Sequence, residues 1–175
     1  MSGHSRWSQI KHKKAASDAK KGQVFSKIAS LIKVAVKEGG VDPETNAKLK
    51  QALVKAKEVN MPSDNIERAL KKSDAEAKLE EVLYEAYGPA GSAFLIEGIT
   101  DNKNRTSPEI KHILSEAGGK LALPGSVIWM FEKKDGVFEP KFTIELGGEE
   151  AKKYESLLES LSDHEAVQEV YTNVA

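Results

Sequence analysis

The sequence Ala-Phe-Leu-Ile-Glu-Gly-Ile-Thr at residues 93–100, followed by Thr-Ser-Pro-Glu-Ile-Lys-His-Ile-Leu-Ser-Glu-Ala at 106–117, contains the clearest structural pattern in this chain. The short apolar run predicts a buried strand, and Asp101–Arg105 predicts a polar loop after it. Thr106-Ser-Pro-Glu109 resembles a capping box and predicts the start of a helix, which Gly118-Gly119 would end. The apolar stripe of this helix is formed by Ile110, Ile113, Leu114 and Ala117. A strand that leads into an amphipathic helix indicates a sheet with helices packed on it.

The residues that follow continue this pattern. Val127–Phe131 predicts a second strand, and the alternating apolar residues of Phe142–Leu146 predict a third. Asp135-Gly136 predicts a hairpin turn between these two strands. Glu149–Leu161 then predicts a helix, and Gln168–Val174 predicts a last strand. The order β-α-β-β-α-β predicts a ferredoxin-like split βαβ sandwich.

The N-terminal half has helical periodicity. Apolar residues keep helical spacing from Gln23 to Lys37, and Gly39-Gly40 provides a stop. Asp42-Pro43 or Thr45 would start a second helix, which Asn60-Met61-Pro62 ends. A third short helix follows Pro62 and contains Ile66, Ala69 and Leu70. We therefore expect an α+β protein in which a basic helical bundle precedes the ferredoxin-like domain.

Charge divides the chain in two. Residues 1–72 contain 16 Lys/Arg and 7 Asp/Glu, whereas residues 73–175 contain 10 and 20. Such an asymmetry indicates two domains, of which one faces a polyanion. The predicted divisions are a basic arm over 1–22, a helical domain over 23–75 and the ferredoxin-like domain over 76–175.

The basic arm has six Lys/Arg and a single acidic residue, Asp18. In a helix, positions seven residues apart, such as Lys13 and Lys20, share one face. Cations interleaved with aromatic rings suit nucleic acid, because counterion release drives phosphate binding and flat rings stack on bases. The alternative is a merely solvated helix face, which the positive charge of the whole N-terminal half makes less favourable. The predicted binding residues are His4, Arg6, Trp7, Lys11, His12, Lys13, Lys14, Lys20 and Lys21.

Secondary contacts are predicted at Arg68, Asn104 and Arg105. The last two lie in a polar loop at a helix N-terminus, where a phosphate could dock, although the favoured interpretation is that Asn and Thr there serve only the turn and cap. Gly88-Pro-Ala-Gly91 matches no phosphate-loop pattern and predicts a turn before a strand.

Composition argues against several function classes. There is no cysteine, and the four histidines have no spacing typical of a metal site, so we predict no cofactor, no metal and no catalysis. The longest apolar runs are far too short for a membrane span, and the N-terminus lacks the apolar region of a secretory signal. We expect a cytoplasmic protein that is not an enzyme.

Several strings in the sequence resemble the YebC family over almost the entire chain. They are Gly-His-Ser-Arg-Trp at 3–7, Ile-Lys-His-Lys at 10–13, Gly-Gly-Val-Asp-Pro at 39–43, Asn-Met-Pro at 60–62, Asn-Ile-Glu-Arg-Ala at 65–69, Tyr-Glu-Ala-Tyr-Gly-Pro at 84–89, Thr-Asp-Asn-Lys-Asn-Arg-Thr at 100–106 and Pro-Gly-Ser-Val-Ile-Trp-Met-Phe at 124–131. The resemblance implies a non-enzymatic regulator of gene expression, described in bacteria as a DNA-binding transcriptional regulator. Mitochondrial relatives are translational activators, and bacterial members are also linked to translation on the ribosome.

The chain departs from the family pattern at one place. The family usually carries a third, small α/β domain between the strands that match 127–131 and 142–146, whereas residues 132–141 here predict only a hairpin. The chain therefore resembles the two-domain core of the family.

Three function classes follow from the sequence. The first is a regulator that binds nucleic acid, either DNA or ribosomal RNA, without an evident trio of Asn, Gln and Arg for reading the major groove. The second is a protein-interaction adaptor whose arm only solubilises. The third, a hydrolase or nuclease, lacks clustered carboxylates in the basic half. Trp129 and Tyr84 are expected to be core or interface residues, a base-stacking sheet is disfavoured, and a monomer is favoured.

Overall fold

The computed structural model describes residues 18–71 and 78–175. They form two compact units. The helical unit contains the described residues up to 81 together with 99–101, and the sheet unit contains 82–98 and 102–175. Within the described residues, no helix is both long enough and apolar enough to cross a membrane.

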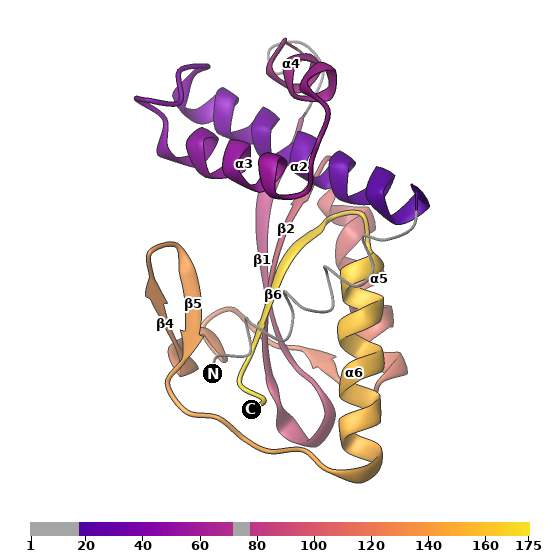
Figure 1. Ribbon diagram of the computed structural model, residues 1–175. Coiled ribbons are helices and arrows are strands. Elements are labelled where there is room, and N and C mark those ends of the chain that lie inside the picture. The colour runs from indigo at the N-terminus through magenta and orange to yellow at the C-terminus, as the bar shows by residue number, and fades with distance from the viewer. Residues whose placement is uncertain (1–17, 72–77) are drawn as a thin grey trace. The chain divides into compact units, whose positions relative to one another are not determined.

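Three helices make up most of the helical unit: α2 (Asp18–Gly39), α3 (Ala47–Glu58) and α4 (Ser63–Lys71) (Figure 1). Their apolar stripes meet in one core, which confirms the predicted bundle of helices. Its buried members are Ile28, Ile32, Ala35, Val36, Leu49, Ala52, Ala56, Met61 and Ala69. The glycine pair ends α2 as predicted: Gly40 has φ +85°, and its N–H donates to the carbonyl of Val36 at 2.8 Å.

The start of α3 differs from the prediction. The helix is capped by Asn46, not by Asp42-Pro43 or Thr45. Asn is among the best N-caps because its side-chain oxygen can accept from a backbone N–H of the first turn. Asp42 instead shapes the preceding turn, where its side chain accepts from the N–H of Glu44 at 2.9 Å.

Four strands form the sheet, in the order β3-β1-β2-β6. They are β1 (Glu80–Tyr87), β2 (Ala93–Thr100), β3 (Lys120–Leu121) and β6 (Val167–Thr172). The strand β2 has the predicted bounds. Helices α5 (Lys103–Glu116) and α6 (Gly148–Asp163) lie on one side of the sheet (Figure 1), and the α+β class is confirmed.

The strand between β2 and β3 is supplied by a different segment from the one predicted. The elements β2, α5 and β3 follow one another in the chain, but in the sheet one other strand lies between β2 and β3. This is a split βαβ arrangement. That middle strand is β1, which precedes β2 in the chain, and the predicted strand over 142–146 is wrong. Only Ile144 of that segment forms a bridge, to Val174.

Two further boundaries are corrected. The helix α5 starts at Lys103 and is capped by Asn102, so the segment 101–105 is not a loop and Thr106 is not a cap. Thr106 is instead almost completely buried within the first turns of the helix. The predicted strand over 127–131 is wrong as well, because a one-turn 3₁₀ helix covers Ile128–Met130.

The opposite face of the sheet is covered by a hairpin of β4 (Phe131–Lys134) and β5 (Val137–Pro140). Its turn is Asp135-Gly136, as predicted, with φ +50° and +83°. Alternate residues of β2 point to different layers. Phe94 and Ile96 pack with the helices, whereas Ala93 and Leu95 pack with apolar residues of the hairpin. The side chains buried on the hairpin side are Ala93, Leu95, Val127, Phe131, Phe138 and Tyr171.

Candidate nucleic-acid interface

Most of the predicted binding residues lie outside the described part of the chain: His4, Arg6, Trp7, Lys11, His12, Lys13 and Lys14. The structure describes the other two, Lys20 and Lys21, in α2. It places Arg68 in the last turn of α4, and Asn104 and Arg105 at the start of α5.

Lys20 and Lys21 are consecutive residues of α2. Lys20 is half-buried and Lys21 is exposed. The charge of their ammonium groups suits contact with a phosphate.

Lysine supplies all the basic side chains of α2 and α3. The sequences of α2 and α3 contain nine lysines and no arginine. An ammonium group binds phosphate as a point charge and lacks the planar fork with which arginine reads a guanine edge. These helices therefore suit contacts to a phosphate backbone better than contacts to particular bases.

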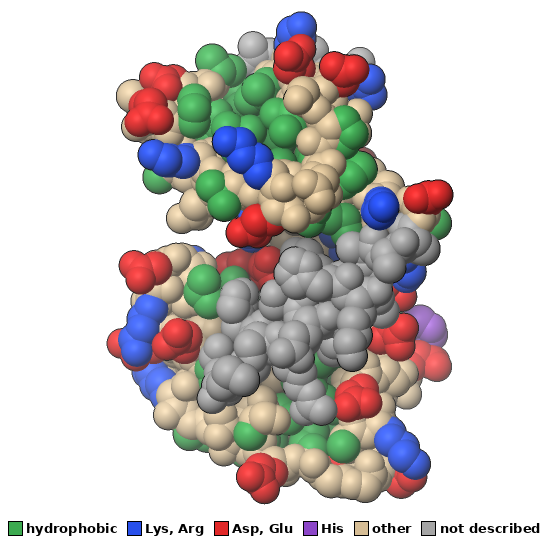
Figure 2. Space-filling view, viewed as in Figure 1, with side chains coloured by type: hydrophobic (Ala, Val, Ile, Leu, Met, Phe, Trp, Pro, Cys, Tyr) green, Lys and Arg blue, Asp and Glu red, His purple; other side chains and the backbone are tan. Residues whose placement is uncertain are grey.

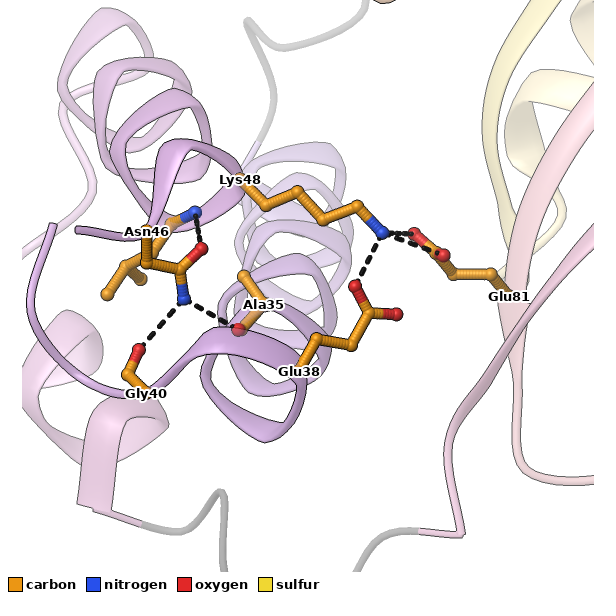
Figure 3. A network of polar contacts seen from close by, with 7 residues as sticks. Ala35, Glu38, Gly40, Asn46, Lys48 and Glu81 are labelled. Carbon is orange, nitrogen blue, oxygen red and sulfur yellow. Dashed lines mark hydrogen bonds and ion pairs between the residues drawn. The ribbon is translucent and has the colours of Figure 1, made fainter.

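Lys48 already forms ion pairs with two carboxylates. Its Nζ lies 2.6 Å from Glu38 Oε2 and 2.9 Å from Glu81 Oε2 (Figure 3). Partial burial by itself would lower the pKa of Lys48, but the hydrogen bonds and charges of the two carboxylates outweigh it and raise the pKa. The residue stays charged, and its charge is balanced within the helical unit.

Asn46 fixes the geometry between α2 and α3. Its Oδ1 accepts from the N–H of Leu49 at 3.1 Å, while its Nδ2 donates to the carbonyls of Ala35 at 2.7 Å and Gly40 at 2.8 Å (Figure 3). The amide is buried and makes one accepting and two donating contacts. A Cβ on Gly39 would come within 2.8 Å of the Asn46 side chain, so the close approach requires glycine. Asn46 thereby sets the angle at which the lysines of the two helices are presented.

Basic side chains are scattered over the visible face of the helical unit. In Figure 2 the blue Lys and Arg side chains of this unit are separated by green, tan and red atoms, so this face shows no continuous basic patch. Arg68 and Lys71 lie at the C-terminal end of α4, where the helix dipole favours cations.

The secondary contact predicted at α5 has competing partners. Nη2 of Arg105 lies 3.5 Å from Oε1 of Glu165, and the backbone N–H of Arg105 donates to Asn102 Oδ1 at 3.2 Å. Nearby, Nε2 of His164 lies 2.8 Å from Oε2 of Glu109. Asn102 is thus a cap, as the alternative interpretation holds, and a phosphate would have to compete with Glu165 for Arg105.

The described residues contain no group of three or more His, Asp or Glu side chains placed to hold a metal ion. Sequence reasoning missed Asn46 and Glu85 as organising residues. The first could have been found, because Asn precedes the apolar residues of α3 at a favourable spacing. The second could not, since nothing in the sequence distinguishes it from the other glutamates around it.

Two family models match the chain. The model described as the TACO1/YebC protein N-terminal domain matches residues 5–76, and the one described as the TACO1/YebC second and third domain matches residues 79–139. Similar proteins include a "probable transcriptional regulatory protein" of Caldanaerobacter subterraneus subsp. tengcongensis, 42% identical over 238 residues that cover 99% of this chain and 98% of that protein. One of the same description from Brachyspira hyodysenteriae is 54% identical over 144 residues, which cover 80% of this chain and 58% of that protein.

The alignment of 238 positions exceeds the 175 residues of this chain, so the Caldanaerobacter protein has residues that are absent here. A solved structure is also similar, that of a conserved hypothetical protein from Aquifex aeolicus. It is 29% identical with a TM-score of 0.82, covering 90% of this chain and 91% of that chain.

Proposed function

The chain belongs to the TACO1/YebC family, and on that basis we propose that it is a non-enzymatic regulator of gene expression that binds nucleic acid. The names of the relatives support regulation of transcription as the process. A cytoplasmic location would suit a chain without cysteine.

One observation carries this proposal, namely the division of charge along the chain. The excess of Lys and Arg over Asp and Glu in residues 1–72 is reversed in residues 73–175. A protein of this kind approaches a polyanion with its basic half, since phosphates attract one half and repel the other. The binding residues we propose are those of the basic arm, continued by Lys20 and Lys21 in α2.

Ribosomal RNA is the second candidate target, and the lysine-only composition of α2 and α3 favours it. A surface that contacts phosphates without reading bases distinguishes DNA sequences poorly. It can still recognise a folded RNA by shape and by the arrangement of its phosphates.

The test compares two quadruple variants of the full chain. Lys13, Lys14, Lys20 and Lys21 are changed to Gln in the first, and Lys111, Lys120, Lys141 and Lys152 of the acidic half are changed to Gln in the second. Fluorescence anisotropy with a DNA duplex and a structured RNA of equal length measures affinity at physiological salt. The arm variant should lose at least tenfold in affinity for both, whereas the control variant, which removes the same number of charges from the acidic half, should lose far less.

Equal affinity of the wild type and the arm variant would refute the arm as the binding element. A single DNA sequence bound orders of magnitude more tightly than random duplex, without cosedimentation with ribosomes, would decide for transcription. Retention on ribosomes with little preference among DNA sequences would decide for ribosomal RNA.

A further inference from the structure

The outward side of α3 carries lysines along both of its edges. Residues seven apart share one face of a helix, so Lys48 and Lys55 lie on one edge and Lys50 and Lys57 on the other. Val54 lies four residues after Lys50 and three before Lys57, and is therefore on the same side as these two. It is 50% exposed although it is apolar. We call Lys50, Val54 and Lys57 the α3 ridge.

The two edges differ in how their charge is balanced. Lys48 lies between two carboxylates, at 2.6 and 2.9 Å. On the ridge, Nζ of Lys50 lies 3.9 Å from Oε1 of Glu44, in a pair whose side chains are 63% and 79% exposed. Such an exposed pair contributes little and is screened by salt. Lys57 is exposed and makes no ion pair with the described residues, so the charge of the ridge is available to an anion from outside.

Helix stability accounts for only part of this arrangement. The helix dipole favours cations near the C-terminal end, where Lys57 lies. It gives no reason for Lys50 in the N-terminal half, and the first turn of α3 contains no acidic residue. Packing gives no reason either, because other positions of the helix form the core, among them Leu49 and Ala52. A polyanion outside the chain accounts for both lysines of the ridge.

The ridge continues the surface that is proposed to bind nucleic acid. The contact of Lys48 with Glu38 holds the start of α3 against the end of α2, and α3 runs back beside α2 (Figure 1). Lys57 therefore lies at the end of α3 that points toward the N-terminal part of α2, which contains Lys20 and Lys21.

We propose that the α3 ridge is a second contact surface for double-helical nucleic acid, at which Lys50 and Lys57 bind phosphates of one strand and Val54 lies against the sugars between them. This inference rests on the proposed function and extends its binding surface beyond the arm and α2. Seven helical residues rise about 10.5 Å and successive phosphates of one strand about 3.4 Å, so the two lysines are spaced about three phosphates apart. The ridge has no arginine and no amide, and therefore contacts the backbone without reading bases.

Salt-dependent binding by the full chain tests this inference. Lys50 and Lys57 are both changed to Gln, and fluorescence anisotropy measures affinity for a random DNA duplex and a structured RNA of equal length from roughly 50 to 200 mM salt. Each phosphate contact with a DNA duplex contributes about −0.9 to the slope of log K against log salt, so this slope should become shallower by about 1.8. The advantage of the wild type should then be about tenfold larger at the lowest salt than at the highest.

Two further variants separate the ridge from a general effect of charge. Lys152→Gln combined with Lys153→Gln removes the same number of charges from an exposed helix of the acidic half, and should leave the slope nearly unchanged. Glu44→Gln removes the carboxylate that competes for Lys50 and should raise the affinity about twofold, a gain that should shrink when Lys50 is also changed to Gln. Circular dichroism confirms that the variants are folded.

Lysine acetylation followed by mass spectrometry locates the contact in the wild-type chain. Bound nucleic acid should slow the reaction of Lys50 and Lys57 several-fold, whereas Lys152 and Lys153 should react as in the free protein. Protection by only one of the two probes would support the ridge and assign it to that nucleic acid. A double variant with the wild-type slope, or ridge lysines that react equally with and without nucleic acid, would overturn the ridge while the arm variant still loses affinity. A wild type that does not bind at physiological salt would overturn the proposed function together with the ridge.

Discussion

Replacing Glu85 by Gln removes a buried charge while keeping the shape of the side chain, and we expect it to loosen the loop that carries Trp129. In the wild type Oε1 accepts from the N–H of Gly125, and Oε2 accepts from those of Val127 and Ile128. Glutamine has a single oxygen. If that oxygen faces Val127 and Ile128, its NH₂ group faces the N–H of Gly125, so that two donors oppose each other.

The expected loss follows from these three contacts. A hydrogen bond to a charged group contributes about 1.5–3 kcal/mol, and a neutral one about 1 kcal/mol. The variant loses one charged hydrogen bond outright and weakens two others to neutral ones. We therefore expect the free energy of unfolding of the sheet unit to fall by at least about 2.5 kcal/mol, the lower end of the sum of these contributions.

Hydrogen exchange measures the effect where it arises. If the loop opens locally, the amides of Gly125, Val127 and Ile128 should exchange about 100-fold faster in Glu85→Gln than in the wild type. Urea unfolding followed by the fluorescence of Trp129 in a Trp7→Phe background reports the loss for the sheet unit. Glu145→Gln changes an exposed glutamate and is the control, expected to leave both measurements unchanged.

At acid pH the wild type and Glu85→Gln should no longer differ in their free energy of unfolding. Burial by itself raises the pKa of Glu85, but the N–H groups of Gly125, Val127 and Ile128 outweigh it and lower the pKa. The carboxylate therefore stabilises the fold above the ordinary pKa of glutamate, about 4.3, and this contribution is lost as the pH falls through the lowered value. Unchanged exchange of the three amides at neutral pH would refute the reasoning, as would a difference in stability that grows toward acid pH.

Three further predictions concern the rest of the chain. Asn46→Ala should lower the free energy of unfolding of the helical unit by about 2–3 kcal/mol, and Asn46→Asp, which keeps the cap acceptor but turns a buried carboxylate oxygen toward the carbonyls of Ala35 and Gly40, should lose at least as much; urea unfolding followed by circular dichroism measures both. With single-stranded RNA, the six cations of the arm should contribute at most roughly −4 to the slope of log K against log salt, and a slope that the quadruple lysine variant leaves unchanged would contradict the arm. Residues 76–175 should fold alone without binding nucleic acid, giving a dispersed NMR spectrum; a molten spectrum would show that its core needs the other half.

Helices and apolar strands could be predicted where periodicity or a continuous apolar run marks them. The stripe of Tyr154, Leu157, Leu158 and Leu161 in α6 is buried as its spacing indicates. The strand β2 is apolar along nearly its whole length because both of its faces are covered, and its bounds are those predicted.

The strand β1 could not be recognised for the opposite reason. Glu80, Glu81 and Glu85 make the segment look like an acidic linker, and Glu85 is a charged residue at a buried position. Its burial is tolerated only because a loop about forty residues away supplies three N–H groups. A contact at that distance along the chain leaves no periodic trace in the sequence. The segment 142–146 has the opposite property, because it looks like a strand in the sequence but is not one in the structure. Its apolar and polar residues alternate, yet only Ile144 makes a bridge, to Val174.

The candidate binding site, too, could be predicted from the sequence only in part. The charge division and the lysine positions can be read directly from the sequence. Which lysines are already neutralised depends on tertiary structure, as Lys48 between Glu38 and Glu81 illustrates. The exposure of Trp129 is likewise invisible in a segment whose composition is that of a core strand.

The separate hairpin of β4 and β5 provides a turn at which another domain could be inserted into the chain. Its tight turn at Asp135-Gly136 belongs to neither the four-stranded sheet nor the helices on its other face. Lengthening a loop at such a tip costs only about 0.6 kcal/mol for each doubling of its length. A fluorescent protein or an affinity module whose ends lie close together could therefore be spliced in at this turn, leaving both chain termini unmodified.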